Sequence, residues 1–294
     1  MITFRRYQYK DNLFEGDFLL VRDFLLELNN PTFSFGWWDY QKTCPSFHAD
    51  DLNKFGLWFE GEQLVALACA EEDLGTGILI AKNGCQTLIG EMIEYAKENL
   101  HDNGKFSLMI PDSDKVYQTA AANAGFFPTQ ERDTDSIIQI DSKNLQYTLP
   151  EGFKIISMAD DYNPVQFDRI MRRGFSGDME ERALSSDERK AIDRQFMRPL
   201  MNLDLQIAVV APDESWAAFC GMWQTAESKT AFIEPVVTDP AYQKMGLGKA
   251  AVYEALSRCG KLGASSAVVF SSLQFYFRIG FHPNATSTWW KKSE

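Results

Sequence analysis

The chain has 294 residues, enough for two domains of ordinary size. Hydrophobic residues make up 45% of the sequence and charged residues 24%, as in soluble proteins with buried cores. The formal net charge is −12, and residues 1–150 carry most of it, with 12 Lys and Arg against 23 Asp and Glu. Such a surface repels polyanions, which argues against nucleic-acid binding, and leaves open whether the acidic half attracts a cationic substrate or only confers solubility.

The sequence offers no sign of a membrane span, a leader segment or a metal site. No run of 18 apolar residues occurs, and the N-terminal residues 1–6 lack the apolar region of a signal peptide. The five cysteines are widely spaced and form no Cys-x-x-Cys pattern, which gives no sign of a metal site. Cys69 and Cys259 fall on apolar patterns, so we expect buried thiols and a reducing cytoplasm.

The first half contains short strands and amphipathic helices. A hairpin is predicted across Glu60-Gly61-Glu62, and a strand over 78–81 is followed by a helix over 88–100. A strand over 106–110 and a helix over 115–124 then end at Gly125-Phe126. The loop at 82–86 carries no paired glycines.

A domain boundary is predicted near Leu149-Pro150-Glu151-Gly152. The second half then begins with a strand over 153–158, two helices around 165–175 and 187–201, and strands over 205–210 and 216–224. The next strand, 230–238, is rich in β-branched and apolar residues, as a buried strand should be. A helix with an apolar face, a strand over 265–270, a short helix and a strand over 286–290 complete the order.

The segment between the strand at 230–238 and the next helix has the character of an anion site. Asp239-Pro240 ends the strand, and Gly246 and Gly248 come at the start of the helix. The first N–H groups of a helix lack internal partners and carry partial positive charge, and glycine lets a pyrophosphate approach the backbone closely. The spacing fits neither the P-loop nor the Rossmann fingerprint, and by itself leaves an ordinary glycine-led helix possible.

Two motifs in sequence order resemble the GCN5-related N-acetyltransferases (GNAT). Gln243, Gly246 and Gly248 fill the family's (Gln/Arg)-x-x-Gly-x-(Gly/Ala) pattern, and residues 276–281 resemble its closing Tyr-x-x-x-Gly-Phe signature. The sequence departs from the family at Val269 and Ser272, where many members have Asn and Ala, which puts the usual contacts near the CoA tail in doubt.

The resemblance implies an α/β (α+β) protein with two tandem acyl-CoA N-acyltransferase folds, each a mixed, mostly antiparallel sheet flanked by helices. The layout is similar to that of bacterial, mycothiol synthase-like tandem acetyltransferases. Residues 1–148 are then a degenerate GNAT-like domain, because Ala121 stands where the second copy has Tyr276. Residues 149–294 are the acetyl-CoA-binding domain. An unrelated α/β domain in the first half is the alternative.

The resemblance also implies roles for individual residues. Tyr276 matches the family's general acid for the leaving thiolate, and Glu234 is the candidate base, with a water chain as its alternative. Backbone groups of the strand would pair with pantetheine, and backbone amides of the loop would hold the pyrophosphate. The cofactor-binding residues are therefore expected to be Val236, Val237, Thr238, Lys244, Met245, Gly246, Leu247, Gly248 and Lys249.

The implied activity is transfer of an acetyl group from acetyl-CoA to a primary amine of a small molecule by direct attack, without a metal. No nucleic acid or membrane partner is expected, and the chain would be a monomer or homodimer. An inactive acyl-CoA-binding sensor or scaffold protein is the first alternative and an aminoacyl transferase the second. Aromatic residues in the first half, Trp37 and Trp38 among them, either form core or line an acceptor pocket.

Overall fold

The computed structural model describes residues 1–10, 12–44 and 47–292. The described chain divides into two compact units, which we treat separately. Unit 1 comprises Met1–Ser136, Phe270–Leu273 and Pro283–Glu294, and unit 2 comprises Ile137–Val269 and Gln274–His282. The compact units therefore divide at residue 136, whereas the sequence places a domain boundary at 148/149, and the C-terminal segment belongs to unit 1.

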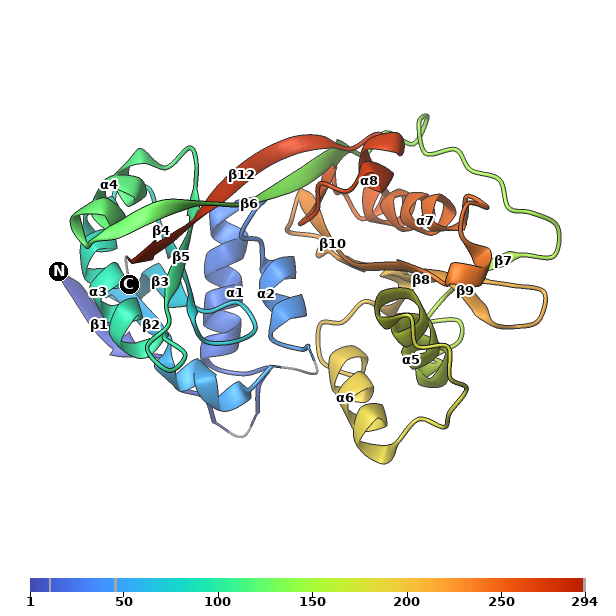
Figure 1. Cartoon of the computed structure of the whole chain (residues 1–294), viewed down its shortest axis with the longest axis horizontal. Coiled ribbons are helices and arrows are strands. Elements are labelled where there is room, and N and C mark those ends of the chain that lie inside the picture. The colour runs from blue at the N-terminus through green and yellow to red at the C-terminus, as the bar shows by residue number, and fades with distance from the viewer. Residues whose placement is uncertain (11, 45–46, 293–294) are drawn as a thin grey trace. The chain divides into compact units, whose positions relative to one another are not determined.

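Unit 1 is built on a mixed sheet with the strand order β1-β2-β3-β4-β5-β12-β6 (Figure 1). The strands are β1 (Ile2–Arg6), β2 (Gly56–Glu60), β3 (Gln63–Cys69), β4 (Thr76–Ala81), β5 (Ser107–Pro111), β6 (Phe126–Gln139) and β12 (His282–Lys292). Strands β1 to β4 are antiparallel neighbours, β4 and β5 are parallel, and β12 pairs antiparallel with β5. The helices are α1 (Asp17–Leu28), α2 (Phe35–Gln41), α3 (Ile89–Asn99) and α4 (Lys115–Asn123).

Unit 2 repeats this arrangement with the strand order β11-β10-β9-β8-β7. Its strands are β7 (Lys154–Ser157), β8 (Gln206–Val210), β9 (Trp216–Trp223), β10 (Thr230–Thr238) and β11 (Ser266–Val269). Strands β7 to β10 are antiparallel neighbours, and β10 and β11 are parallel. The helices are α5 (Pro164–Met171), which continues into a π-helical turn at Arg172–Ser176, α6 (Ser186–Phe196), α7 (Leu247–Lys261) and α8 (Gln274–Arg278).

The sheet of unit 2 has a helix layer on each face. Helix α7 lies on one face, and its buried side chains pack in a core with β8, β9 and β10. Helices α5 and α6 cover the opposite face, where Phe167 and Phe196 pack against Phe219 of β9 (Figure 1). Strands β8 and β9 are buried along their whole length because both faces are covered.

The two units share a local motif as well as a strand order. In unit 1, α4 is followed by Gly125 at φ 82° and by buried Phe126. In unit 2, α8 is followed by Gly280 at φ 91° and by buried Phe281. Each glycine adopts the left-handed conformation that ends a helix, and each phenylalanine begins or precedes the long strand that follows. The predicted repeat of one fold in both halves is therefore confirmed.

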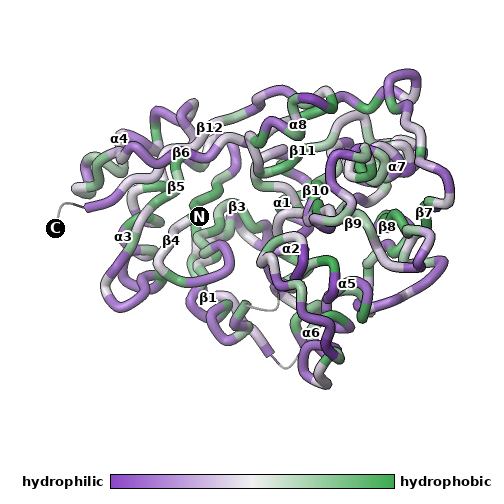
Figure 2. Tube along the Cα trace, turned by 45° about the vertical axis from the view of Figure 1, so that its right-hand side comes forward, coloured by the Kyte–Doolittle hydropathy of each residue, from purple (hydrophilic) through white to green (hydrophobic). Residues whose placement is uncertain are grey.

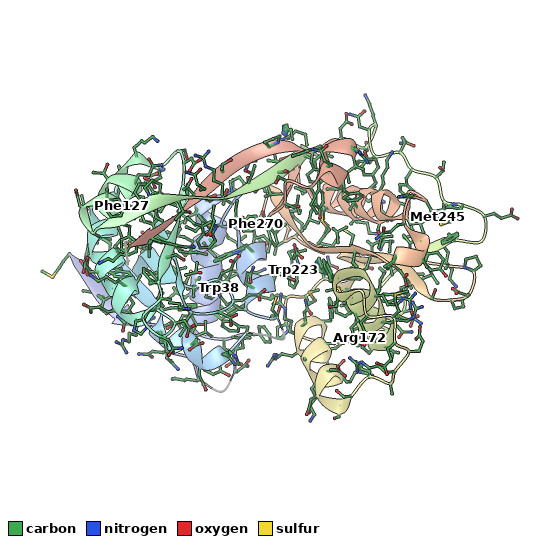
Figure 3. All side chains as sticks on the ribbon, viewed as in Figure 1. Trp38, Phe127, Arg172, Trp223, Met245 and Phe270 are labelled. Atoms are coloured by element: carbon green, nitrogen blue, oxygen red, sulfur yellow. The ribbon has the colours of Figure 1, made fainter. Side chains whose placement is uncertain are left out.

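Several elements of unit 1 differ from the sequence prediction. Helices α1 and α2 were not predicted, and Trp37 and Trp38 lie in α2. Both tryptophan side chains have 0% exposure, so they belong to the core (Trp38 in Figure 3). Strand β6 was also missed, because its sequence is hydrophilic over most of its length (Figure 2).

Candidate active site

Strand β10 has an unpaired backbone edge beyond its midpoint. Its parallel pairing with β11 runs only from Thr230 to Phe232, whereas its antiparallel pairing with β9 continues to Thr238. Between Ile233 and Val236 the register with β9 shifts, at the cis peptide bond that precedes Pro235. Within the described chain, residues 236–238 thus have a strand partner on one side only. Such an edge can pair with an extended ligand that carries amide groups.

The loop after β10 is fixed at its first residue. The Asp239 N–H donates to the Ala217 carbonyl at 3.0 Å, and the Asp239 carboxylate accepts from the Ala241 N–H at 2.9 Å. The Tyr242 hydroxyl donates to the Asp213 carboxylate at 3.0 Å. These contacts hold residues 239–242, and the exposed residues 243–246 then lead into α7.

The N-terminus of α7 presents an array of free backbone donors. In the part of the chain that the structure describes, the N–H groups of residues 243–249 donate no hydrogen bond. Lys244 at φ 63° and Gly246 at φ 81° turn the backbone, and the helix lacks a side-chain cap. A 15-residue helix with uncapped N–H groups can bind an anion, and its binding of a pyrophosphate stays a prediction.

Glycine is required at the two positions of the motif for different structural reasons. A side chain at Gly246 would meet nothing within 4 Å, so this residue is needed for its left-handed φ and its open surroundings. A Cβ at Gly248 would lie 2.9 Å from Thr238 Oγ1 and 3.4 Å from the Phe275 ring. Gly248 therefore lets the first turn of α7 pack directly on the end of β10, which brings the strand edge and the loop together.

The remaining predicted loop residues differ in exposure. Lys244 and Met245 are exposed, with Met245 at 41% (Figure 3), whereas Leu247 is buried in the core. The Lys249 ammonium lies 4.8 Å from the centre of the Tyr253 ring, one turn further along α7. This cation–π contact directs the Lys249 side chain along the helix.

Tyr276 is held in α8 by aromatic packing. Its side chain is 6% exposed, and its ring lies 5.1 Å from that of Phe275 and 5.4 Å from that of Phe281. Its hydroxyl makes no hydrogen bond to any residue described by the structure. Burial, together with the negative charge of Glu234 and the nearby Cys220, raises the pKa of Tyr276 well above its ordinary value. The phenol consequently stays protonated throughout the neutral range and is available as a hydrogen-bond donor.

Glu234 is half-buried at the bend of β10. Its backbone carbonyl accepts a hydrogen bond from the indole N–H of Trp223, with a distance of 2.7 Å (Trp223 in Figure 3). A Cβ on Gly221 would lie 2.5 Å from the same carbonyl oxygen, so β9 approaches β10 closely at this point. Because its charge acts on the phenol of Tyr276, the two predicted catalytic residues belong to the same region of unit 2.

The structure adds one group of residues that sequence analysis did not identify. Arg169 and Arg173, one helical turn apart on α5 and the π-helical turn, both bind the carboxylate of Asp239. No sequence pattern marks this contact, because Arg173 and Asp239 are 66 positions apart. The nearby acidic run at 176–181 is not a free cation site, since Asp178 binds Arg172 at 2.6 Å and Glu181 binds Arg169 at 3.2 Å.

A separate cavity of about 370 Å³ lies within unit 1. Its lining residues include Glu71, Arg132, Asp133 and Asp135. Asp135 is 5% exposed, and its carboxylate accepts hydrogen bonds from the Thr32 hydroxyl at 2.7 Å and from the Ala285 N–H at 2.7 Å. These bonds tie β6 to β12 and to the loop before α2, so Asp135 has a structural role.

Three further observations concern the described residues. None of their helices is both long and apolar enough to cross a membrane. They contain no group of three or more His, Cys, Asp or Glu side chains arranged to hold a metal ion. Cys69 and Cys259 are fully buried free thiols, as their place in apolar patterns predicted.

Comparisons with known proteins agree with this architecture. Three solved structures illustrate the likeness. A GCN5-related N-acetyltransferase from Sphaerobacter thermophilus has a TM-score of 0.56 at 15% identity, covering 81% of this chain and 80% of that one. A tandem GNAT protein from the clavulanic acid biosynthesis pathway has a TM-score of 0.58 at 12% identity, covering 99% and 98%. The N-myristoyltransferase of Saccharomyces cerevisiae has a TM-score of 0.55 at 11% identity, covering 98% and 77%.

At these identities the structural matches show the fold alone. A search of curated proteins gave no match. In a comparison with family models, residues 171–281 match the acetyltransferase (GNAT) family. This range begins at the end of α5 and includes β10, the glycine loop, α7 and Tyr276. The chain thus has the GNAT fold throughout, and its segment 171–281 is similar to the acetyltransferase (GNAT) family.

Proposed function

We propose that the chain is an acetyl-CoA-dependent N-acetyltransferase that acts on a primary amine of a small molecule. The observation that carries this proposal is the combination, in one unit, of the open edge of β10 with the uncapped N-terminus of α7. The first suits the amide groups of pantetheine and the second suits a pyrophosphate. Gly248 packs the two features against each other, so that one extended ligand could reach both.

In this proposal the chain's residues perform three tasks. Backbone groups of Val236 to Thr238 and of Lys244 to Lys249 bind acetyl-CoA and fix its thioester, since positioning lowers the barrier of a two-reactant step. Glu234 accepts a proton from the amine, whose nitrogen forms a bond to the acetyl carbon as the carbon–sulfur bond breaks. Tyr276 donates a hydrogen bond to the departing sulfur, and its raised pKa keeps the donor in place at neutral pH.

The surroundings of the reaction are part of the proposal. The excess of negative charge in residues 1–150 is in keeping with a cationic amine as acceptor and with no nucleic-acid partner. Residues 151–294, which would bind acetyl-CoA, carry 17 Lys and Arg against 18 Asp and Glu and are nearly neutral. We place the protein in the cytoplasm, without a membrane partner, as a monomer or homodimer. The resemblance to mycothiol synthase-like tandem enzymes remains a proposal that rests on the sequence motifs and the repeated fold.

The test is calorimetric titration of acetyl-CoA into the wild type, Gly246→Asp and Gly263→Asp. Both glycines have a positive φ, and a Cβ would meet nothing within 4 Å at Gly246 and only Lys229 Nζ, at 3.8 Å, at Gly263. Gly246 precedes α7 whereas Gly263 follows it. Asp tolerates the left-handed conformation, so the two variants differ chiefly in where the new charge lies. One wild-type site, weakened at least tenfold in Gly246→Asp and within twofold in Gly263→Asp, is the expected result.

Turnover is then measured as the release of free thiol in the presence of a panel of primary amines. Faster thiol release in the presence of an amine would support the acetyltransferase activity. Tight binding without acceleration by any amine would favour an acyl-CoA-binding protein that has lost turnover. Absence of acetyl-CoA binding in the wild type would refute the proposed function and turn attention to aminoacyl donors.

A further inference from the structure

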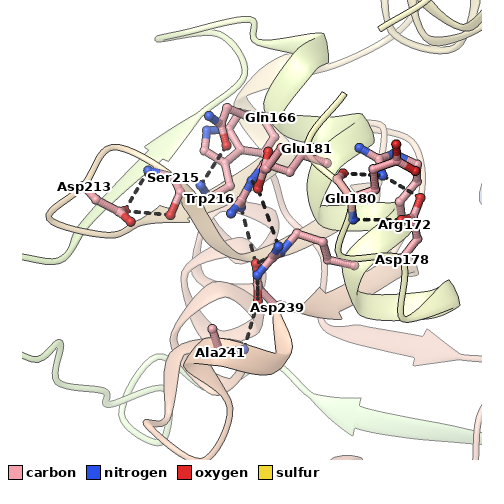
Figure 4. A network of polar contacts seen from close by, with 12 residues as sticks. Gln166, Arg172, Asp178, Glu180, Glu181, Asp213, Ser215, Trp216, Asp239 and Ala241 are labelled. Atoms are coloured by element: carbon pink, nitrogen blue, oxygen red, sulfur yellow. Dashed lines mark hydrogen bonds and ion pairs between the residues drawn. The ribbon is translucent and has the colours of Figure 1, made fainter. Parts of the chain in front are cut away.

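The loop that precedes α7 is anchored by a buried ionic contact at its first residue. Asp239 is 0% exposed, although a carboxylate is costly to bury without compensation. Compensation comes from Arg173, whose Nε lies 2.6 Å from Oδ2, and from Arg169, whose terminal nitrogen lies 3.3 Å from the same oxygen. Figure 4 shows Asp239 at the centre of this network, with Ala241 bound to it from the loop side.

The arginines come from a segment that is packed rigidly against β10. Arg173 belongs to the π-helical turn at 172–176, a form of helix that is rare and is often found at functional sites. A Cβ at Gly174 would lie 2.0 Å from Val237 Cγ2, so the backbone of this turn touches the strand that precedes the loop. The guanidinium of Arg173 is thereby held at a fixed place relative to the end of β10.

We propose that Arg173 and Asp239 form a positioning pair that holds the loop at 240–246 in the conformation that binds acetyl-CoA. The inference rests on the proposed function, because it assigns the pair a task in binding the same ligand. An array of backbone N–H groups binds an anion tightly only if it is ordered beforehand, since ordering on binding costs conformational entropy. Asp239 begins that loop, and the pair ties it to the helix layer.

The ion pair also neutralises the charge of Asp239 close to the proposed pyrophosphate position. An uncompensated carboxylate at the base of the loop would repel the pyrophosphate that the proposal places at the start of α7. Two guanidinium groups neutralise Asp239, and the Arg173 side chain is only 10% exposed, so solvent screens this contact weakly. Arg173 is a positioning residue in this scheme, since it acts through Asp239 and not on the ligand.

Arg172 provides a matched control. It is the neighbour of Arg173 on the same turn, is 14% exposed, and binds Asp168 at 2.9 Å and Asp178 at 2.6 Å. It makes no ion pair with the loop among the described residues. Arg172→Gln and Arg173→Gln therefore remove the same charge and a comparable set of ionic contacts, but only the second removes an ion pair of Asp239, which is then left with the longer contact to Arg169.

The experiment combines acetyl-CoA titration with hydrogen–deuterium exchange of the ligand-free full chain. We expect Arg173→Gln to weaken acetyl-CoA binding about tenfold and to raise exchange at 240–249 without raising it in β8 and β9. Arg172→Gln should leave both within twofold of the wild type. Equal binding in folded Arg173→Gln, or an equal loss in Arg172→Gln, would overturn the proposal.

A second variant guards against a folding defect. Asp239→Asn keeps a side-chain oxygen that accepts from the Ala241 N–H and removes the charge that binds Arg173. It should show the same loss of affinity and the same local rise in exchange. Unfolding of both variants, judged by circular dichroism, would make the pair a determinant of the fold and would refute the positioning role. If the wild type fails to bind acetyl-CoA, the proposed function fails, while the exchange result still decides whether the pair holds the loop.

Discussion

Replacement of Gly174 by alanine tests the contact between the π-helical turn and β10. The new Cβ would lie 2.0 Å from Val237 Cγ2, far inside the distance of an ordinary van der Waals contact. Val237 is 5% exposed and packs in the core between β9 and the helix layer, so it has little room to move. Either the turn or the strand must therefore shift.

The expected cost follows from two opposing effects. Overpacking of a filled core costs about 1–3 kcal/mol. Replacing glycine by alanine in a helical backbone returns roughly 0.5–1 kcal/mol, because glycine loses more conformational entropy on folding. Gly174→Ala should therefore lower the free energy of unfolding by about 1–2 kcal/mol. Gly90→Ala in α3, where a Cβ would meet nothing within 4 Å, should instead raise it by up to about 1 kcal/mol.

The assay is urea denaturation of the wild type, of Gly90→Ala, of Gly174→Ala and Val237→Ala singly, and of the double variant Gly174→Ala/Val237→Ala. Val237→Ala removes the methyl group that meets the new Cβ, so the double variant should lose less stability than the sum of the two single changes. A favourable coupling of about 1 kcal/mol or more is expected. If Gly174→Ala had the free energy of unfolding of the wild type, or if the two changes were strictly additive, the turn would not pack against β10 as closely as described.

Two other predictions concern ionisable groups. Tyr276→Phe keeps the packing against Phe281 but loses the hydroxyl. Steady-state kinetics should show turnover reduced at least tenfold, while titration should show an acetyl-CoA affinity within twofold of the wild type. Unchanged turnover would remove Tyr276 from the mechanism. Because its pKa is raised, ionisation of this phenol should cause no loss of wild-type rate below about pH 10. Burial lowers the pKa of Lys42 in unit 1 to about 8, below the ordinary value of 10.5, so the unfolded chain retains this proton at pH values where the folded chain has released it. Urea denaturation should therefore show the wild type gaining up to about 3 kcal/mol relative to Lys42→Met as the pH rises from about 8 to 10.5, and a constant difference would contradict the assigned environment of Lys42.

The sequence predicts those parts of unit 2 that depend on local patterns. Strand β10 has the predicted bounds, Thr230–Thr238, because β-branched and apolar residues run without interruption up to Asp239-Pro240. Helix α7 follows from an apolar face between Gly246 and Gly263. The uncapped N-terminus of α7 was also predictable, because the motif offers glycine where a capping side chain would otherwise stand.

Other features depend on contacts between distant residues and leave no local pattern. Strand β6 carries the hydrophilic sequence Glu131 to Asp135 and is recognisable only by its place in the sheet. Helix α2 contains two adjacent tryptophans and is buried on most sides, so it lacks the one-sided apolar stripe that marks a surface helix. The contact between Arg173 and Asp239 joins a helix to a loop, and neither residue type is unusual in its own segment.

The place of β12 bears on how the two halves should be studied. Residues 287–291 pair antiparallel with 107–111 of β5, so the last strand of the chain completes the sheet of unit 1. A fragment of residues 1–148 would leave that edge of β5 without its partner, and exposed strand edges promote aggregation. A fragment of 149–294 would carry β12 without β5. Strand β5 lies in the first half of the sequence and its partner β12 in the second half. Acetyl-CoA binding should therefore be measured with the full chain. Strand β5 of the first half thus gives the C-terminal segment its place to pair, a structural role that needs no tyrosine at the position of Ala121.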